Sequence, residues 1–212
     1  MVPKRHSSAM ASRLLAILAL LSLTGCDRMA RQAAKEPEYR PEEAKTVDHA
    51  LCLLGFEGVP LRTVATGHHL VTAEVNGYPG AFVVDTGANA SVLHAGDAAA
   101  FGVGQGITLP GAAVGLGGPM QARQARIDTM RIGGIGIRQS RIMVADLAQL
   151  RHILGLASGE KVAGIIGQDV MQEHRAVIDA ARPILYLIAA DRDPAPVAAE
   201  RCRKPAPPAK KG

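Results

Sequence analysis

Apolar and polar residues alternate with a period of two through much of the middle of the chain, which predicts β-strands. The stretch 70–75 places every second side chain on one apolar face, and 81–84 is apolar throughout. Between them lies Asn76-Gly77, the strongest short signal for a tight hairpin turn, and 78–80 extends that turn. We therefore expect a hairpin whose second strand ends near residue 84.

Most of the remaining pattern is also of the strand type. Apolar residues at helical spacing run through 145–156, and 97–101 suits a single helical turn. The glycine-rich stretch 102–118 carries no charged residue. The pattern predicts a mainly β, strongly bent, barrel-like domain with one or two short helices. Its other strands are expected at 91–93, 126–130, 135–144, 176–178 and 184–188.

The N-terminal 26 residues have the pattern of a processing segment. Basic residues precede an apolar run at 14–23, which is too short to cross a hydrocarbon core of ~30 Å as a helix. The run ends in Leu-Thr-Gly followed by Cys26. This ending resembles a bacterial lipoprotein signal at 1–26, in which Cys26 becomes the acylated first residue of the mature chain. The alternative is an ordinary secretory signal with an incidental cysteine.

The mature chain divides into three parts by composition. Residues 27–46 are polar and alternate in charge, which predicts a tether, and 47–191 form one domain. The first residues of that domain, 47–55, suit a short helix or a docking strand. The basic tail at 192–212 is rich in proline and lysine and is expected to be disordered.

The resemblance to lipoproteins also implies a location. Asp27 directly follows Cys26, a pattern associated with retention in the inner membrane of some Gram-negative bacteria. We therefore expect a bacterial cell-envelope protein that is lipid-anchored to the inner membrane and faces the periplasm.

The formal net charge of +5 does not describe the domain. Residues 27–191 hold fifteen basic and seventeen acidic residues, whereas the tail holds six basic and two acidic ones. The domain therefore has no charge pattern for nucleic acid. The adjacent His68 and His69 would point to opposite faces of a strand, and no further ligands lie at metal spacing. We expect neither a metal nor another cofactor.

The chemistry is concentrated in the triplet Asp85-Thr86-Gly87, which follows the apolar residues 82–84 and occurs once in the chain. Far downstream, 164–171 reads Gly-Ile-Ile-Gly-Gln-Asp-Val-Met. Together these motifs resemble the retropepsin-like aspartic proteases, most closely their bacterial membrane-associated branch, which carries Asp-Thr-Gly-Ala. The resemblance covers about 67–187 and implies a single-lobe, closed or bent β-barrel.

The resemblance implies roles for residues of the motifs. Asp85 is the expected catalytic residue, supported by its loop neighbours, and the later strand packs behind the loop. The carboxylate works in a pair whose members share one proton, activate a water and protonate the scissile carbonyl oxygen. Because the chain has one triplet, the second carboxylate must come from a second copy of the chain. The supporting residues are Thr86, Gly87 and Ala88 in the loop, and Ile165, Ile166 and Gly167 in the strand.

Three neighbouring positions are candidate contacts within the loop or across the dimer: Asn89, Gln168 and Asp169. Viral members often carry an Asp–Arg pair where this chain has Asn89 and Gln168, so we expect an amide–amide hydrogen bond there. Substrate would be covered by a glycine-rich hairpin, the flap, for which the candidates are Leu116, Gly117, Gly118 and Met120.

Export of the chain would leave Cys52 and Cys202 in an oxidising compartment, where an even pair suggests a disulfide. The bridge could form within a chain or between chains, or both thiols could stay unpaired.

The sequence therefore predicts an aspartic endopeptidase that acts as a homodimer on peptide or protein substrates at the membrane surface. Two alternatives stay open. One is a peptide-binding module of the same fold without catalysis, and the other is an envelope lipoprotein with a structural role.

Overall fold

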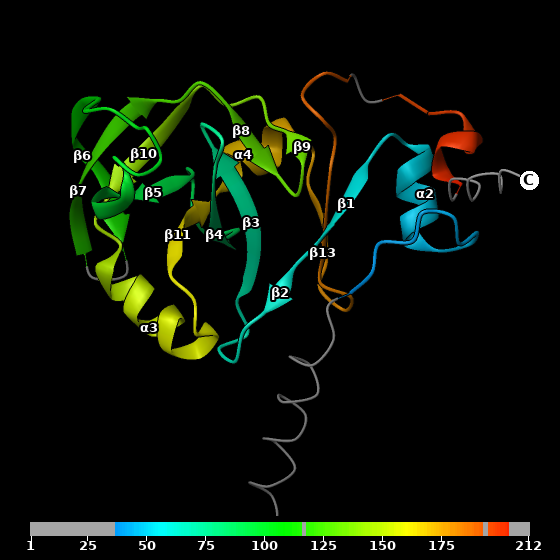
Figure 1. The fold of residues 1–212 in the computed structure, drawn as a ribbon, viewed down its shortest axis with the longest axis horizontal. Coiled ribbons are helices and arrows are strands. Elements are labelled where there is room, and N and C mark those ends of the chain that lie inside the picture. The colour runs from blue at the N-terminus through cyan, green and yellow to red at the C-terminus, as the bar shows by residue number, and fades with distance from the viewer. Residues whose placement is uncertain (1–36, 116–117, 193–194, 204–212) are drawn as a thin grey trace, which may run out of the picture. The chain divides into compact units, whose positions relative to one another are not determined.

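The computed structural model describes residues 37–115, 118–192 and 195–203 (Figure 1). The predicted signal peptide at 1–26 with Cys26, half of the predicted tether and the end of the tail therefore lie outside the described residues. No helix in these three segments is long and apolar enough to cross a membrane.

Two β-sheets dominate the described residues, which confirms the mainly β class. The smaller sheet has the order β1-β13-β12 and contains β1 (Glu57–Pro60), β12 (Val177–Asp179) and β13 (Ile184–Leu187). The larger sheet contains β2 (Arg62–Thr63), β3 (His69–Val75), β4 (Tyr78–Val84), β5 (Val92–His94), β6 (Ile107–Gly115), β7 (Gly118–Arg126), β8 (Met130–Ile132), β9 (Ile135–Gly136), β10 (Arg141–Ala145) and β11 (Val162–Ile166).

Helices are short and few in the described part of the chain. The α-helices are α2 (Val47–Leu53), α3 (Ala148–Ser158) and α4 (Gln168–Glu173), and the 3₁₀ turns are η1 (Ala95–Asp97) and η2 (Ala199–Cys202). Thr46 caps α2 because its side chain accepts a hydrogen bond from the backbone N–H of His49 at 3.2 Å. The stretch that suited either a helix or a docking strand is therefore a helix.

The larger sheet is open, so the closed form of the predicted barrel is wrong. Its strand order is β6-β7-β10-β5-β11-β4-β3-β8-β9, with β2 paired to β3. The two ends of this path, β6 and β9, do not pair with each other, and β9 is only two residues long. Such a short strand offers few hydrogen bonds with which to close a sheet.

The β3–β4 hairpin confirms the prediction made from the Asn76-Gly77 turn. Both turn residues have positive φ, 53° and 82°, as a tight two-residue turn requires. The Asn76 side chain also accepts a hydrogen bond from the backbone N–H of Asp128 at 2.7 Å. The second strand begins at Tyr78 and not at residue 81, because two residues are enough to reverse the chain.

Strand β3 buries one face along most of its length, whereas its other face buries Leu70 and exposes Thr72. Val71, Ala73 and Val75 join the main apolar cluster, as their alternation predicts. Leu70 belongs to a second cluster, in which Leu154 of α3 is fully buried. Helix α3 therefore covers one face of the larger sheet (Figure 1).

The smaller sheet is tied to both ends of the described chain. Cys52 in α2 and Cys202 in η2 form a disulfide within the chain, one of the alternatives that the sequence left open. The Tyr39 ring lies against Gly58 of β1, where a Cβ would come within 2.4 Å of it. The end of the predicted tether is thus packed against the domain.

Asp48 joins these segments through a buried carboxylate that is 1% exposed. Arg182 donates to Asp48 Oδ1 at 2.9 Å, the Tyr186 hydroxyl donates to the same oxygen, and the Arg40 N–H donates to Oδ2 at 2.8 Å. Burial raises the pKa of Asp48, but the hydrogen bonds from Arg182 and Tyr186 outweigh it and hold the pKa below the ordinary value. Asp48 is therefore ionised and stabilising at neutral pH.

We expect Asp48→Asn to lower the free energy of unfolding at pH 7 by about 2–3 kcal/mol, because buried donors lose a charged acceptor. Urea unfolding measures the difference. The folded pKa lies below 3.8, so this stabilisation is present above about pH 4 and is lost as pH falls through the folded pKa. The variant and the wild type should therefore converge in acid.

The control is Asp191→Asn, whose side chain is 80% exposed and which should change stability by less than ~0.5 kcal/mol. A difference between Asp48→Asn and wild type that stayed constant down to pH ~2 would contradict the role given to the Asp48 charge.

Candidate functional site

The Asp85 loop lies where two parallel strands end side by side. Strands β4 and β11 are paired in parallel, with Val84 opposite Ile166. The next backbone N–H of the loop, that of Asp85, donates to the Ile166 carbonyl oxygen at 3.0 Å. The loop then turns into β5, which pairs with β11 from the other side. Strand β11 therefore fixes both ends of the loop.

The Asp85 carboxylate is held by the loop backbone and stays partly exposed. Its Oδ1 accepts a hydrogen bond from the Gly87 N–H at 2.8 Å, and the Ala88 N–H donates to the Asp85 carbonyl oxygen at 3.2 Å. Thr86 and Gly87 are exposed, whereas Asp85 and Ala88 are half-buried. The structure thus places the predicted catalytic residue at the surface with one oxygen already oriented.

The predicted supporting strand has the expected position. Ile166 is fully buried and Ile165 nearly so, between β4 and β5. A Cβ at Gly167 would lie 2.5 Å from the backbone of Ala90, and one at Gly164 would lie 2.2 Å from the Val92 carbonyl oxygen. Glycine is required at both positions because backbone occupies the space of a side chain.

Asp169 joins the loop to the helix that follows the supporting strand. Its Oδ1 accepts hydrogen bonds from the N–H and hydroxyl of Ser91 at 2.9 and 2.7 Å, and from the Val170 N–H at 2.8 Å. Its Oδ2 accepts from the Gln139 amide at 2.8 Å. The Ser91 hydroxyl in turn accepts from the Gly167 N–H at 3.0 Å. Asp169 is therefore a contact within the chain that fixes the end of the loop.

The sequence did not identify Ser91 or Gln139 as site residues. Ser91 is fully buried and lies 78 positions from Asp169 in the chain. A serine at the start of a predicted short strand carries no signal for such a distant partner. Only the antiparallel pairing of β5 with β11 brings the two together.

The expected hydrogen bond between Asn89 and Gln168 is not formed within the chain. The Gln168 amide donates to the Thr86 carbonyl oxygen at 2.7 Å, and its oxygen accepts from the Gln172 amide at 3.1 Å. The Asn89 side chain is exposed. Gln168 begins α4 directly below the loop, so the loop carbonyl is the nearer partner. Gln168 thus supports the Asp85 loop from inside the same subunit.

The flap candidates that the structure describes belong to the β6–β7 hairpin. Gly118 and Met120 lie on β7, opposite Gly115 and Ala113 of β6. Leu116 and Gly117 lie outside the described residues. The expected glycine-rich hairpin is therefore formed, and its strands are longer than predicted because β7 pairs with β10 on its other side. Its role as a flap stays a prediction.

The described ranges contain no group of three or more His, Cys, Asp or Glu side chains placed to hold a metal. Each histidine of the adjacent pair has a threonine near one ring nitrogen, Thr66 at 2.9 Å from His68 and Thr63 at 3.0 Å from His69. Burial lowers the pKa of His69, which favours its neutral form.

The chain is similar to known aspartic proteases. A family model described as aspartyl protease matches residues 71–170. No curated protein matches the sequence. Among solved structures, the EIAV protease complexed with the inhibitor HBY-793 is 24% identical, covering 49% of this chain and 84% of its own, with a TM-score of 0.38. A retropepsin-like aspartic protease from Rickettsia conorii is 19% identical, covering 63% and 88%, with a TM-score of 0.42.

We expect Gly167→Ala to lower the free energy of unfolding by about 1–3 kcal/mol, because the new methyl group overlaps the Ala90 backbone and must displace the loop. The backbone at Gly167 is extended, with φ −104°, so alanine meets no conformational strain there. Denaturant unfolding measures the loss.

Gly136→Ala is the matched control, because a Cβ at Gly136 meets no heavy atom within 4 Å. It should change stability by less than ~0.5 kcal/mol. Equal stabilities of the two variants would show that the close approach at Gly167 does not constrain the loop.

Proposed function

We propose that the protein is an aspartic endopeptidase that works as a homodimer, because a family model described as aspartyl protease matches residues 71–170. The observation that carries the proposal is the Asp85 loop, in which a strand end presents one oriented, partly exposed carboxylate. Peptide hydrolysis of this kind needs two such carboxylates, and the sequence has one Asp-Thr-Gly triplet. The second Asp85 therefore comes from a second copy of the chain.

The surface around the loop supports this assembly. Thr86, Gly87 and Asn89 are exposed in the single chain although they surround the reactive group. Below them, Gln168 and Asp169 hold the loop through hydrogen bonds within the chain. A rigid loop with an uncovered outer face is suited to contact with its own copy across a twofold axis.

The chemistry follows from the pair of carboxylates. The ionised Asp85 takes a proton from a water held between the two groups, and the water oxygen attacks the scissile carbonyl carbon. The protonated Asp85 gives its proton to the carbonyl oxygen, which forms a neutral tetrahedral diol. Collapse of the diol breaks the C–N bond, one carboxyl group protonates the leaving amine, and the other takes the hydroxyl proton. The Gly87 N–H keeps Oδ1 oriented throughout.

We also propose that the enzyme is anchored in the inner membrane and faces the periplasm. The apolar run at 14–23 followed by Cys26 supports acylation of this cysteine. The disulfide between Cys52 and Cys202 suits an oxidising compartment. Substrates would then be peptides or proteins of the cell envelope that reach the membrane surface.

We expect Asp85→Asn to lower kcat for cleavage of a mixed peptide library by about 10³-fold or more, because the amide can neither activate water nor shuttle a proton. Mass spectrometry of the products at acidic to neutral pH measures the loss. Equal cleavage by variant and wild type would remove Asp85 from the reaction.

Mixing tests the shared site separately. The wild type is mixed with an equal amount of Asp85→Asn at concentrations where dimers dominate and subunits exchange between them. Wild-type activity should then fall to about one half, because half of the wild-type subunits enter inactive mixed dimers. Thr66→Ala, an exposed change outside the loop, is the folding control. A wild type that is strictly monomeric in sedimentation, yet active, would contradict the homodimer. A dimer without cleavage would favour the peptide-binding alternative.

We expect Cys26→Ser to move the protein from the membrane fraction to the soluble periplasmic fraction in a Gram-negative host, because the acyl chains provide the anchor. Labelling with radioactive palmitate should disappear in parallel. Cys202→Ser keeps Cys26 and should still be labelled. Membrane retention with labelling unchanged in Cys26→Ser would contradict the lipoprotein assignment.

A further inference from the structure

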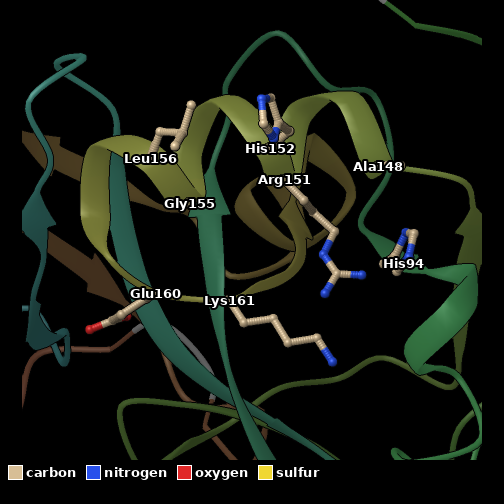
Figure 2. Close-up of a pocket in the computed structure, with 8 residues that line it drawn as sticks. All are labelled: His94, Ala148, Arg151, His152, Gly155, Leu156, Glu160 and Lys161. Carbon is tan, nitrogen blue, oxygen red and sulfur yellow. The ribbon is translucent and has the colours of Figure 1, made fainter.

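A pocket lies beside α3, away from the Asp85 loop (Figure 2). Its volume is about 430 Å³, within the range of small-ligand sites. Its walls come from α3, from the end of β5 and from the segment before β11. The lining residues are His94, Ala148, Arg151, His152, Gly155, Leu156, Glu160 and Lys161.

The sheet topology separates this pocket from the catalytic loop. The loop follows the ends of β4 and β11 and precedes β5, whereas the pocket lies where β5 ends, at His94, and β11 is about to begin, after Lys161. Strand β11 spans Val162–Ile166, so its ends are about 13 Å apart at ~3.3 Å per residue. A ligand of this pocket would therefore not occupy the Asp85 site.

The pocket floor carries a surplus of positive charge. Arg151 and Lys161 extend into the same space below α3 (Figure 2) and share the Asp97 carboxylate, at 3.2 and 2.7 Å. Asp97 is nearly buried, and one carboxylate cannot neutralise two cations. Glu160 points away from the pocket and pairs with Arg62. Arg151 and Lys161 each have more donors than this single acceptor uses.

His94 adds a neutral hydrogen-bond donor at the side of the pocket. Its Nδ1 accepts from the Leu147 N–H at 3.0 Å, so the ring proton lies on Nε2. Burial and the nearby Arg151 lower the pKa of His94, while Asp97 and Asp146 act in the opposite direction. The ring is therefore uncharged at neutral pH, and the surplus charge is that of Arg151 and Lys161.

The helix wall of the pocket is opened by Gly155. Glycine is the least favourable helix-interior residue after proline, and α3 carries it within Ala148–Ser158. A Cβ there would meet only the Glu160 carbonyl oxygen, at an ordinary 3.5 Å. Packing does not require glycine at this position, whereas an open pocket does. Leu156, 77% exposed, stands at the edge of the opening.

We propose that this pocket binds an acidic peptide segment, with a carboxylate side chain on Arg151 and Lys161 and a neighbouring aliphatic side chain on the apolar wall. The surplus positive charge selects the carboxylate, since charge-assisted hydrogen bonds form with the donors that Asp97 leaves free. The wall at Gly155, Ala148 and Leu156 supplies the apolar contact. The site is a second binding site that does not involve Asp85.

The test is fluorescence anisotropy with the full chain carrying Asp85→Asn, so that the probe is not cleaved. The probe is fluorescein-Gly-Ala-Leu-Asp-Leu-Ala-amide, and its matched control has Asn in place of Asp. We expect the Asp peptide to bind about tenfold more tightly than the Asn peptide, and more weakly as salt screens the charges. Equal affinity of the two peptides would overturn the proposal.

Variants of the pocket locate the binding. Adding Gly155→Leu fills the pocket and should weaken binding of the Asp peptide by about tenfold or more. Adding Lys161→Met should weaken binding of the Asp peptide and leave binding of the Asn peptide unchanged. Gln149→Leu changes an exposed residue of α3 that does not line the pocket and should have no effect. Parental affinity in a folded Gly155→Leu variant would place the binding elsewhere.

Gly155→Ala is the second variant, to be used if Gly155→Leu fails to fold. It should raise the melting temperature by about 2–4 °C through helix propensity, and weaken peptide binding severalfold. A lower melting temperature would show that packing requires this glycine and would overturn the argument. If the wild type cleaves no peptide but the probe still binds at this pocket, the proposed protease activity is wrong and the proposed binding site is supported.

Discussion

The insertion of β11 between β4 and β5 is the constraint on which the site depends. Strand β11 approaches so closely that Gly164 and Gly167 touch backbone where a side chain would stand. In return, its backbone holds the loop at two points: the Asp85 N–H donates to Ile166, and the Gly167 N–H donates to Ser91. The Asp85 carboxylate is thus positioned mainly by main-chain contacts. These contacts depend on glycine and small polar residues more than on the identity of the apolar core residues.

A second set of buried polar contacts fixes the smaller sheet. Asp48 accepts from Arg182, Tyr186 and the Arg40 backbone, which joins α2 to the turn before β13 and to the segment that precedes α2. The disulfide between α2 and η2 closes the same region. All three strands of this sheet come from one chain, because β13 pairs with both β1 and β12. The protomer therefore forms a three-stranded sheet from its own strands, with β1 and β12 at the edges.

Local patterns predicted the features that depend on neighbouring residues. The Asn76-Gly77 hairpin, the helix near 145–156 and the closing strands near 176–178 and 184–188 all lie within a few residues of their expected positions. A glycine-rich hairpin was expected only around 114–120, whereas β6 and β7 together extend from Ile107 to Arg126, because strands of this length in glycine-rich sequence need β10 as a neighbour. The docking of Tyr39 on Gly58 and the link from Ser91 to Asp169 join residues with no local relation. For the same reason, the sequence carried no signal for the contact of the Gln168 amide with the Thr86 carbonyl oxygen.

Two glycines show how far sequence reading can go. Gly167 and Gly155 look alike in the chain, because each directly follows an apolar residue of a predicted element. At Gly167 the Ala90 backbone leaves no room for a methyl group, so the glycine is a requirement of the fold. At Gly155 a methyl group would make one ordinary contact, so the fold gains nothing from glycine and α3 loses helix propensity. A residue that the fold does not need, placed on the wall of a charged pocket, is better explained by what the pocket holds.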